Sequence, residues 1–292
     1  MYVRSGGNLS SVRYTAAPPS LVEVLDPRPL LRTAWGRRSL LAQLTRREIE
    51  GRYRGSLLGV AWSFATPVAF LAIYTFVFGA VFRARWPQAP RASLAEFAVV
   101  LFAGLVVFNF FSECASRAPG LIASAPNYVK KVVFPLELLA LSVAASAAAH
   151  ALVSLVVLVA STALLGRIPP ATALLLPLVM APLFLMGVGM LWLLSSVGVF
   201  LKDTTYVVNL GLQLALFTTP IFYPVEAVPS SLQLAIALNP LTPVVDSVRR
   251  AALWGLPPGW RGLGWAAAVG LATAVLGYSC LRATRRAFAD VL

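Results

Sequence analysis

The sequence has little charge for its length. Charged residues make up 12% of its 292 residues, hydrophobic residues make up 59%, and the mean hydropathy is +0.79. Soluble domains usually carry about 25% charged residues. No charged side chain occurs from Leu57 to Phe82, and a helix of that length rises roughly 39 Å, which exceeds the ~30 Å of bilayer hydrocarbon. The composition therefore predicts a polytopic membrane protein and excludes most soluble enzymes.

The sequence also lacks the usual catalytic and metal-binding motifs. It contains no G-x-x-x-x-G-K-[ST] phosphate loop and no G-x-S-x-G nucleophile motif. Its one histidine, His150, lies among alanines, which favours a hydrogen bond between helices over a metal ligand. Its two cysteines, Cys114 and Cys280, are expected to be buried thiols. We therefore expect no cofactor or metal in this chain and no catalytic residue.

Acidic residues are scarce within the apolar runs. Glu96, Glu113, Glu137 and Asp203 border predicted spans and lie near their ends. Ion-coupled carriers usually place ionisable groups near the middle of the membrane. The sequence therefore lacks the ionisable groups that a proton or sodium relay needs in the middle of the membrane. The energy for any transport is expected to come from another subunit.

The apolar runs predict an all-α membrane protein with six transmembrane helices. The spans are expected at about 57–82, 97–115, 134–165, 171–200, 205–223 and 262–281. Residues 1–54 are expected to form a cytoplasmic N-terminal tail with an interface helix, and residues 55–292 to form the transmembrane domain. Most of the 24 basic residues fall on one side of this arrangement, which places both termini in the cytoplasm. No apolar core of a cleavable signal peptide precedes position 54.

Residues 30–50 alternate leucines with arginines, which is typical of an amphipathic helix lying on the inner membrane face, with Trp35 at head-group level. Thr45 followed by Glu48 fits a capping box, so a second helix is expected to begin there. Basic charge beside a span indicates topology and contact with anionic lipid rather than nucleic acid. A solvated charged linker is the alternative interpretation.

Two further segments are unusual. Residues 116–133 form the largest inner loop, and Leu121, Ile122 and Ala123 are expected to make a short helix there, although an ordinary loop fits the composition as well. Residues 223–255 are too apolar for a free loop and too rich in proline to span, so we expect short half-helices dipping into the outer leaflet. Asp246 is expected to pair with Arg249 and Arg250 near the outer surface.

Aromatic side chains are the remaining candidates for contact with a substrate, because their rings stack on the apolar faces of sugars without desolvating a charge. Packing against helices or lipid is the alternative for each of them. The pore-lining candidates are Trp62, Phe64, Tyr74, Phe76, Phe78, Phe108, Phe110 and Phe111.

Three segments together resemble one family. The run RREIEGRYRGSLLGVAWSFATP is similar to the start of the first span in ABC-2 type transporter permeases of bacterial polysaccharide export. YVKKVVFPLELLALS resembles their approach to the third span, and FLKDTTYVVNLGLQLALFTTPIFYPVEAVP with ALNPLTPVV resembles their fifth-span region. The likeness covers residues 40–285 in order and spacing. It is greatest to O-antigen exporters, and teichoic-acid and capsule permeases share much of the pattern.

The resemblance implies the type V exporter fold: a homodimer in the bacterial inner membrane, bound to two copies of an ABC ATPase subunit that holds ATP and Mg²⁺. It implies a cargo of polysaccharide linked to undecaprenyl diphosphate, whose diphosphate Arg46, Arg47, Arg52 and Arg54 are candidates to receive; lipid anchoring is the alternative for these arginines. The implied coupling helix at about 117–131 holds Arg117, Pro119, Gly120, Leu121, Ile122, Pro126, Tyr128, Lys130 and Lys131. The implied outer gate helices at about 227–253, with the segments beside them, hold Tyr223, Pro224, Pro229, Asn239, Pro240 and Pro243.

Three other functions remain open. An ABC permease for a small hydrophobic drug or lipid would share the fold. A lipid-modifying membrane enzyme would need a polar catalytic cluster at the membrane surface, and the sequence offers none. A secondary carrier is disfavoured because charges in the middle of the membrane are missing.

Overall fold

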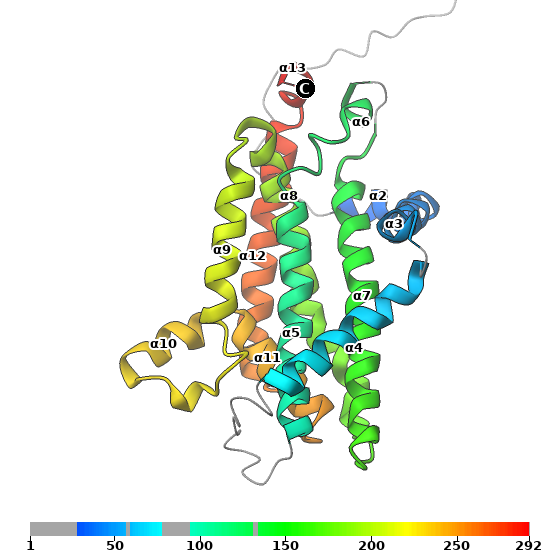
Figure 1. Ribbon diagram of the computed structural model, residues 1–292. Helices are drawn as coiled ribbons and strands as arrows, with labels where there is room; N and C mark the ends of the chain where they lie inside the picture. Colours follow the sequence, from blue (N-terminus) through cyan, green and yellow to red (C-terminus); the bar gives the residue numbers. More distant parts are fainter. Residues whose placement is uncertain (1–27, 57–58, 78–93, 131–133, 292) are drawn as a thin grey trace, which may run out of the picture.

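The structure, a computed structural model, describes residues 28–56, 59–77, 94–130 and 134–291, and all regular elements in these ranges are helices. The long helices of the bundle are α5 (Leu94–Arg117), α7 (Glu137–Leu164), α8 (Leu176–Phe200) and α12 (Trp260–Thr284). Figure 1 shows them side by side and roughly parallel. Within the described ranges these are the four helices that are long and apolar enough to cross a membrane, with α8 extended by the short helix η3 (Ala171–Leu175). They lie where the second, third, fourth and sixth spans are expected.

The first and fifth predicted spans correspond to shorter helices. Helix α4 (Trp62–Tyr74) begins after the short helix η1 (Gly59–Ala61) and runs obliquely across the bundle (Figure 1); positions 57–58 and 78–82 of the predicted span lie outside the described residues. Helix α9 (Thr204–Thr218) has 15 residues and rises about 22 Å. It stops because Pro220 disfavours helical backbone at Thr219, whose φ and ψ are −89° and 133°. The six-span count therefore stays a prediction.

The closest packing in the bundle joins α8 to α12 through glycines. A Cβ atom at Gly277 would meet the backbone of Gly189, and one at Gly189 would meet the backbone of Thr273 and Ala274. Small residues allow helix backbones to approach in this way within membranes, where dispersion contacts rather than water drive association. The ring of Trp192 on α8 packs at a tilt against that of Tyr278 on α12, with ring centroids 5.3 Å apart. These two helices therefore pack with their backbones in contact.

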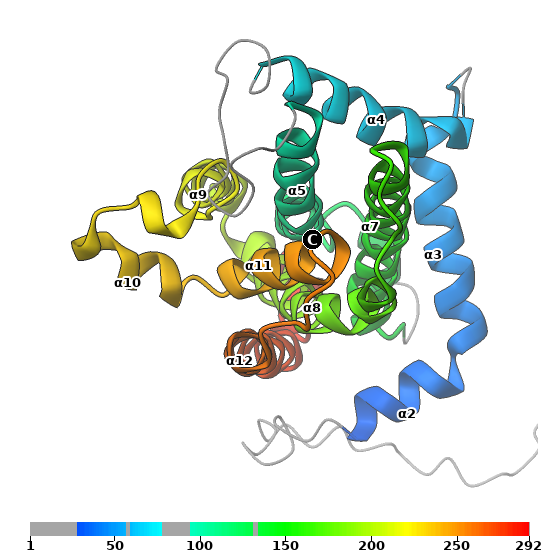
Figure 2. The ribbon, with the colours of Figure 1, turned by 90° about the horizontal axis from the view of Figure 1, so that it is seen from below.

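The two ends of the bundle carry different short helices (Figures 1 and 2). We call one the α6 end: it holds α2 (Arg28–Gly36), α3 (Arg38–Tyr53), α6 (Pro126–Lys130) and α13 (Phe288–Val291). We call the other the α11 end: it holds η4 (Val225–Ala227), α10 (Ser230–Leu238) and α11 (Leu241–Ala252). The predicted orientation makes the α6 end the cytoplasmic one. The short helices expected between 223 and 255 are present, and their role as a gate stays a prediction.

Two local expectations are wrong. Helix α3 is continuous through Thr45, whose hydroxyl donates to the carbonyl of Leu41 at 2.9 Å; a capping box requires that hydroxyl to accept a bond at a helix start. In the loop after α5, residues 121–123 form hydrogen-bonded turns, and the short helix α6 begins instead at Pro126. Proline suits the first turn of a helix, where its missing N–H would have no partner.

Candidate functional site

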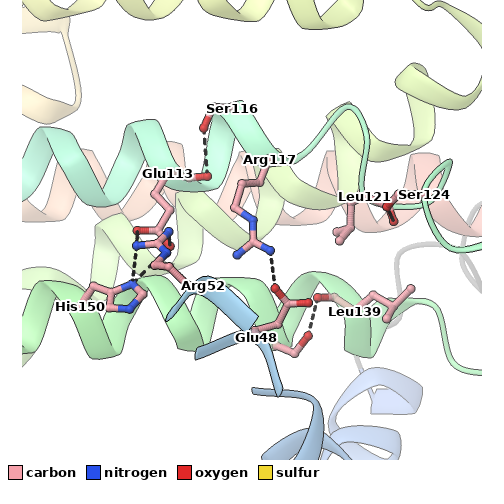
Figure 3. Close-up of polar contacts among 10 residues, drawn as sticks. Glu48, Arg52, Glu113, Ser116, Arg117, Leu121, Ser124, Leu139 and His150 are labelled. Carbon is pink, nitrogen blue, oxygen red and sulfur yellow. Dashed lines mark hydrogen bonds and ion pairs between the residues drawn. The ribbon is translucent and has the colours of Figure 1, made fainter. Parts of the chain in front are cut away.

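Two oppositely oriented ion pairs join α3 to the end of α5. Glu48 on α3 pairs with Arg117, the last residue of α5 (Figure 3). One turn along each helix, Arg52 pairs with Glu113 at 2.5 Å. The spacing of four residues on both helices makes this match possible, because residues i and i+4 lie on one face of a helix. The two helices run in opposite directions at this contact, so Glu48 of α3 meets Arg117 of α5 and Arg52 of α3 meets Glu113 of α5.

His150 of α7 completes the second pair. Its Nδ1 lies 2.8 Å from Nη1 of Arg52 and 3.4 Å from Oε1 of Glu113. The side chains of His150 and Glu113 are each 14% exposed, so water screens their interaction only weakly. The cluster thus ties α3, α5 and α7 together, and it provides the contact between helices that was expected of the histidine.

The loop after α5 is packed onto the bundle rather than standing free. Ala118, Pro119 and Ile122 are buried. Pro119 lies close to Gly198 at the end of α8, and a Cβ atom added to Gly198 would meet the backbone of Pro119. The hydroxyl of Tyr128 accepts a hydrogen bond from Arg47 of α3 at 3.2 Å. A force on this loop would therefore act at once on α3, α5 and α8.

Two hollows lie at this end of the bundle, and Arg47, Glu48 and Arg117 border both of them. One, of about 770 Å³, lies between α3 and the loop and includes Leu44, Arg117, Gly120, Leu121 and Tyr128 in its walls. The other, of about 890 Å³, is bordered by charged side chains and the glycine of α3. Its lining residues are Arg47, Glu48, Glu50, Gly51, Arg52, Arg54 and Arg117.

The four arginines proposed for head-group contact differ in their partners. Arg46 pairs with Glu50 at 2.6 Å on the exposed side of α3. Arg52 is held by Glu113, whereas Arg47 donates to a neutral hydroxyl, so its charge is less compensated there. Arg47, Arg52 and Arg54 border the charged hollow, and Arg46 does not. Lys130 ends α6, and Lys131 lies outside the described residues.

The aromatic candidates fall into two groups. Phe108 and Phe110 are buried in the core of the chain, and Phe110 stacks near Phe184 of α8. Tyr74 and Phe111 are partly buried against it. Trp62, Phe64 and Phe76 are exposed on α4 and its extension, and Phe78 lies outside the described residues. The pore-lining role stays a prediction for all of them, and Trp62, Phe64 and Phe76 are the exposed rings among the candidates that the structure describes.

Trp62 also lines a cleft of about 490 Å³ between α4, α5 and α7. Phe70 and Asn109 contribute to its walls, and Glu113 and His150 lie in it as well. Rings beside amide and hydroxyl groups are the combination that suits sugars, since the ring faces cover apolar C–H groups while the polar groups bond hydroxyls.

At the α11 end, the pairing expected of Asp246 with Arg249 and Arg250 stays a prediction, but Arg249 is buried and does not lie at the surface. Arg249 is 4% exposed and donates hydrogen bonds to three backbone carbonyls, those of Val100, Pro220 and Ile221. Arg250 donates to the carbonyl of Pro257. Local spacing along α11 could not reveal these partners, because Val100 lies on a distant part of the chain.

Pro224, Pro229 and Pro240 each stand directly before a short helix, at η4, α10 and α11 respectively, and Pro243 lies within α11. Their fixed φ and missing N–H suit helix starts. They account for the breaks that the proline pattern predicted in this segment.

Sequence reasoning also missed the roles of Glu48 and Glu113. The signal was present, since each acidic residue is followed four positions later by an arginine, at Arg52 and Arg117. Pairing one such motif with the other required knowing that α3 crosses α5.

The bundle, with its N-terminal helices at one end and its broken helices at the other, defines a polytopic α-helical membrane protein, and no group of three or more His, Cys, Asp or Glu side chains among its described residues could hold a metal ion. Residues 39–253 match the family model described as "ABC-2 type transporter", so the chain belongs to that family.

Characterised relatives cover most of the chain. It is 28% identical over 220 residues to the O-antigen export system permease protein RfbA of Myxococcus xanthus, which covers 75% of this chain and 82% of the relative. A protein of the same name from Klebsiella pneumoniae is 28% identical over 211 residues, covering 72% and 78%. The polysialic acid transport protein KpsM of Escherichia coli is 26% identical over 247 residues, covering 82% and 92%.

Proposed function

We propose that this chain is the membrane channel subunit of an ABC transporter that exports a lipid-linked polysaccharide, O-antigen in the first instance, across the bacterial inner membrane. The observation that carries the proposal is the match to the ABC-2 family together with similarity to permeases of O-antigen export over most of the chain. In this proposal the lipid carrier is undecaprenyl diphosphate. Two copies of the chain form the channel, and a separate ATPase subunit, also in two copies, binds ATP and Mg²⁺.

The geometry of the α6 end supports a coupling role for the loop between α5 and α7. The buried Ala118 and Ile122 fasten the loop to the bundle, and Arg117 at its start is paired with Glu48 of α3. When the ATPase closes on ATP and presses on this loop, α5 and α3 move together. Because α3 leads into α4, the motion reaches the exposed aromatic helix that borders the cleft. The glycan then passes along weak, repeated contacts, which suit a long polymer because each sugar must also leave.

The charged hollow supports entry of the carrier from the α6 end. Arg47 and Arg54 border it, and a diphosphate accepts charge-assisted hydrogen bonds from several guanidinium groups at once. The apolar carrier chain would remain in the lipid beside α4.

Deletion of the gene from its own organism tests the function. We expect loss of polysaccharide from the cell surface, accumulation of undecaprenyl-linked polymer in the inner membrane, and recovery of both when the gene is returned. Unchanged surface polysaccharide would overturn the proposal. Altered tolerance to small hydrophobic compounds with intact polysaccharide would favour a permease for drugs or lipids instead.

Similarity to KpsM favours one second candidate, export of an acidic capsular polymer such as polysialic acid. The same deletion separates the two, because O-antigen appears on lipopolysaccharide whereas a capsular polymer does not. Purification of the chain from the same membranes should also recover an ABC ATPase, identified by its phosphate-binding loop, in equal amount.

A further inference from the structure

The guanidinium of Arg249 is the meeting point of three elements at the α11 end. Its Nε donates to the carbonyl of Val100 in α5 at 3.1 Å. Its Nη1 and Nη2 donate to the carbonyls of Pro220 and Ile221, just beyond α9, both at 2.9 Å. Arg249 itself belongs to α11 and is buried. Only an arginine offers a planar fork of donors that reaches several acceptors at once.

These bonds give partners to backbone carbonyls just beyond the end of α9. The last carbonyls of a helix have no partner within it, and in a membrane no water replaces that partner. Here Tyr223 donates to the carbonyl of Phe217 at 2.7 Å, and Asn239 donates to that of Thr218 at 3.5 Å. The carbonyl of Thr219 accepts from the N–H of Ile221, and Arg249 donates to the carbonyls of Pro220 and Ile221 that follow. The broken backbone after α9 is therefore satisfied by side chains from the segment that follows it.

Gly104 makes room for the guanidinium on α5. A Cβ atom at Gly104 would lie 3.1 Å from Nη2 of Arg249 and 3.2 Å from Cγ2 of Ile221. It stands four residues after Val100, whose carbonyl therefore accepts from both the helix and Arg249. A side chain at this position would push the arginine away from α5.

Helix α9 depends on this contact because little else of it is buried. Thr204, at its α6 end, is its one buried residue. Leu210, Leu214 and Phe217 are among the large apolar side chains that it exposes. Figure 1 shows α9 beside the bundle with α11 beneath its end. The side chains of α9 that pack against the core, Leu212, Ala215 and Leu216, lie in its half nearest the α11 end, so its attachment to the bundle is strongest toward that end.

We propose that Arg249 is a positioning residue that pins the end of α9 to α5 and α11, so that α9 swings about this end during transport. The swing rests on the proposed transport function, whereas the anchor rests on the geometry alone. The anchor keeps the turn between α9 and α10 in place, while the half of α9 nearer the α6 end, which is mostly exposed apart from Thr204, shifts against lipid or a second copy of the chain.

Hydrogen–deuterium exchange of the full-length protein in lipid nanodiscs tests the anchor. We expect Arg249→Gln to raise amide exchange in residues 215–224 about tenfold, the effect of losing one hydrogen bond to a charged group. Residues 137–164 of α7 should exchange as in the wild type. Arg249→Lys, which retains one point charge, should give a smaller rise. Arg250→Gln is the matched control, because Arg250 bonds to Pro257 instead of α9, and it should leave residues 215–224 unchanged.

Gly104→Ala provides a second route that keeps the arginine and adds one methyl group. We expect it to raise exchange in residues 215–224 as well, and it decides the question if Arg249→Gln fails to insert into membranes. Unchanged exchange in this segment, or an equal rise in α7, overturns the anchor, because the effect would then be absent or global.

The swing is tested by transport in the complex with the ATPase subunit. We expect Arg249→Lys to hydrolyse ATP at the wild-type rate while exporting severalfold less polymer per ATP. Export per ATP equal to that of the wild type would overturn the swing. If the wild-type complex exports no polysaccharide, the proposed function fails, and the exchange experiment still decides the anchor.

Discussion

Glu48 and Arg117 form an ion pair between helix α3 and the residue at which α5 passes into the following loop. Their side chains are about one third exposed, at 28% and 35%. Exposed or partly exposed pairs contribute only about 0.2–1 kcal/mol to stability. We therefore expect this pair to matter for transport more than for stability, because it joins the start of the loop after α5 to α3, the helix that leads into α4.

Charge reversal tests this connection. Glu48→Arg or Arg117→Glu alone places like charges together, and we expect export to fall severalfold with little change in the amount of protein in the membrane. The double reversal restores the attraction and should restore most of the export, with a coupling energy of about 0.5–1 kcal/mol in a double-mutant cycle. The measurement is surface polysaccharide in the deletion strain carrying each variant.

A matched control lies at the other end of the bundle. Arg167 and Glu96 pair at 2.6 Å, away from α3 and outside the charged hollow. Reversing both of these charges together should leave export unchanged. A double reversal at Glu48 and Arg117 that remains as defective as either single change would contradict the role proposed for that pair.

The close approach of α8 and α12 predicts that Gly277→Ala is destabilising. The added Cβ atom would overlap the backbone of Gly189, which cannot move like a flexible side chain. Overpacking of this kind costs about 1–3 kcal/mol. Gly264→Ala, on the same helix with open space around its Cβ position, should be neutral or slightly stabilising. Thermal denaturation of the two purified variants in one detergent decides the matter, and equal midpoints would contradict the packing.

Much of the fold was predictable because apolar runs and helix breakers are local signals. The interval from Gly166 to Pro170 separates α7 from α8 as expected, and Gly166 has a positive φ of 73° that suits a helix end. The end of α9 was placed too late, because an apolar run continues past Thr218 although Pro220 stops the helix. Hydropathy depends on the composition of a whole segment, whereas the end of this helix depends on the backbone restriction that Pro220 places on Thr219.

The candidate site was less predictable because its contacts join distant parts of the chain. Asp246 and Arg249 are correctly spaced for a pair on one helix, yet Arg249 bonds to carbonyls of Val100 and Pro220. Glu113 was recognised only as a charge at the end of a span, although it links Arg52 to His150. Spacing along one helix indicates what shares a face but does not reveal what packs against that face.

The burial of the aromatic side chains predicts opposite effects for two substitutions. Phe108 is 6% exposed, so Phe108→Ala should create a cavity and destabilise the protein by about 3–5 kcal/mol. Trp62 is 44% exposed and lines the cleft beside α4. Trp62→Ala should therefore leave the thermal midpoint nearly unchanged while slowing export of the polymer. Normal export by Trp62→Ala would argue that this ring contacts lipid rather than glycan.

The position of Arg54 on the border of the charged hollow predicts weaker binding of the lipid carrier in Arg54→Gln. Loss of one hydrogen bond to a charged group should lower the affinity for undecaprenyl diphosphate about tenfold, measured by native mass spectrometry of the purified complex. Arg38→Gln is the control, because Arg38 lies at the start of α3, the helix that ends just before Arg54, over the ring of Trp35 and outside the hollow. If Arg54→Gln weakens binding to vesicles of anionic phosphatidylglycerol as strongly as it weakens binding to the diphosphate, Arg54 anchors the helix to the membrane and does not select the carrier.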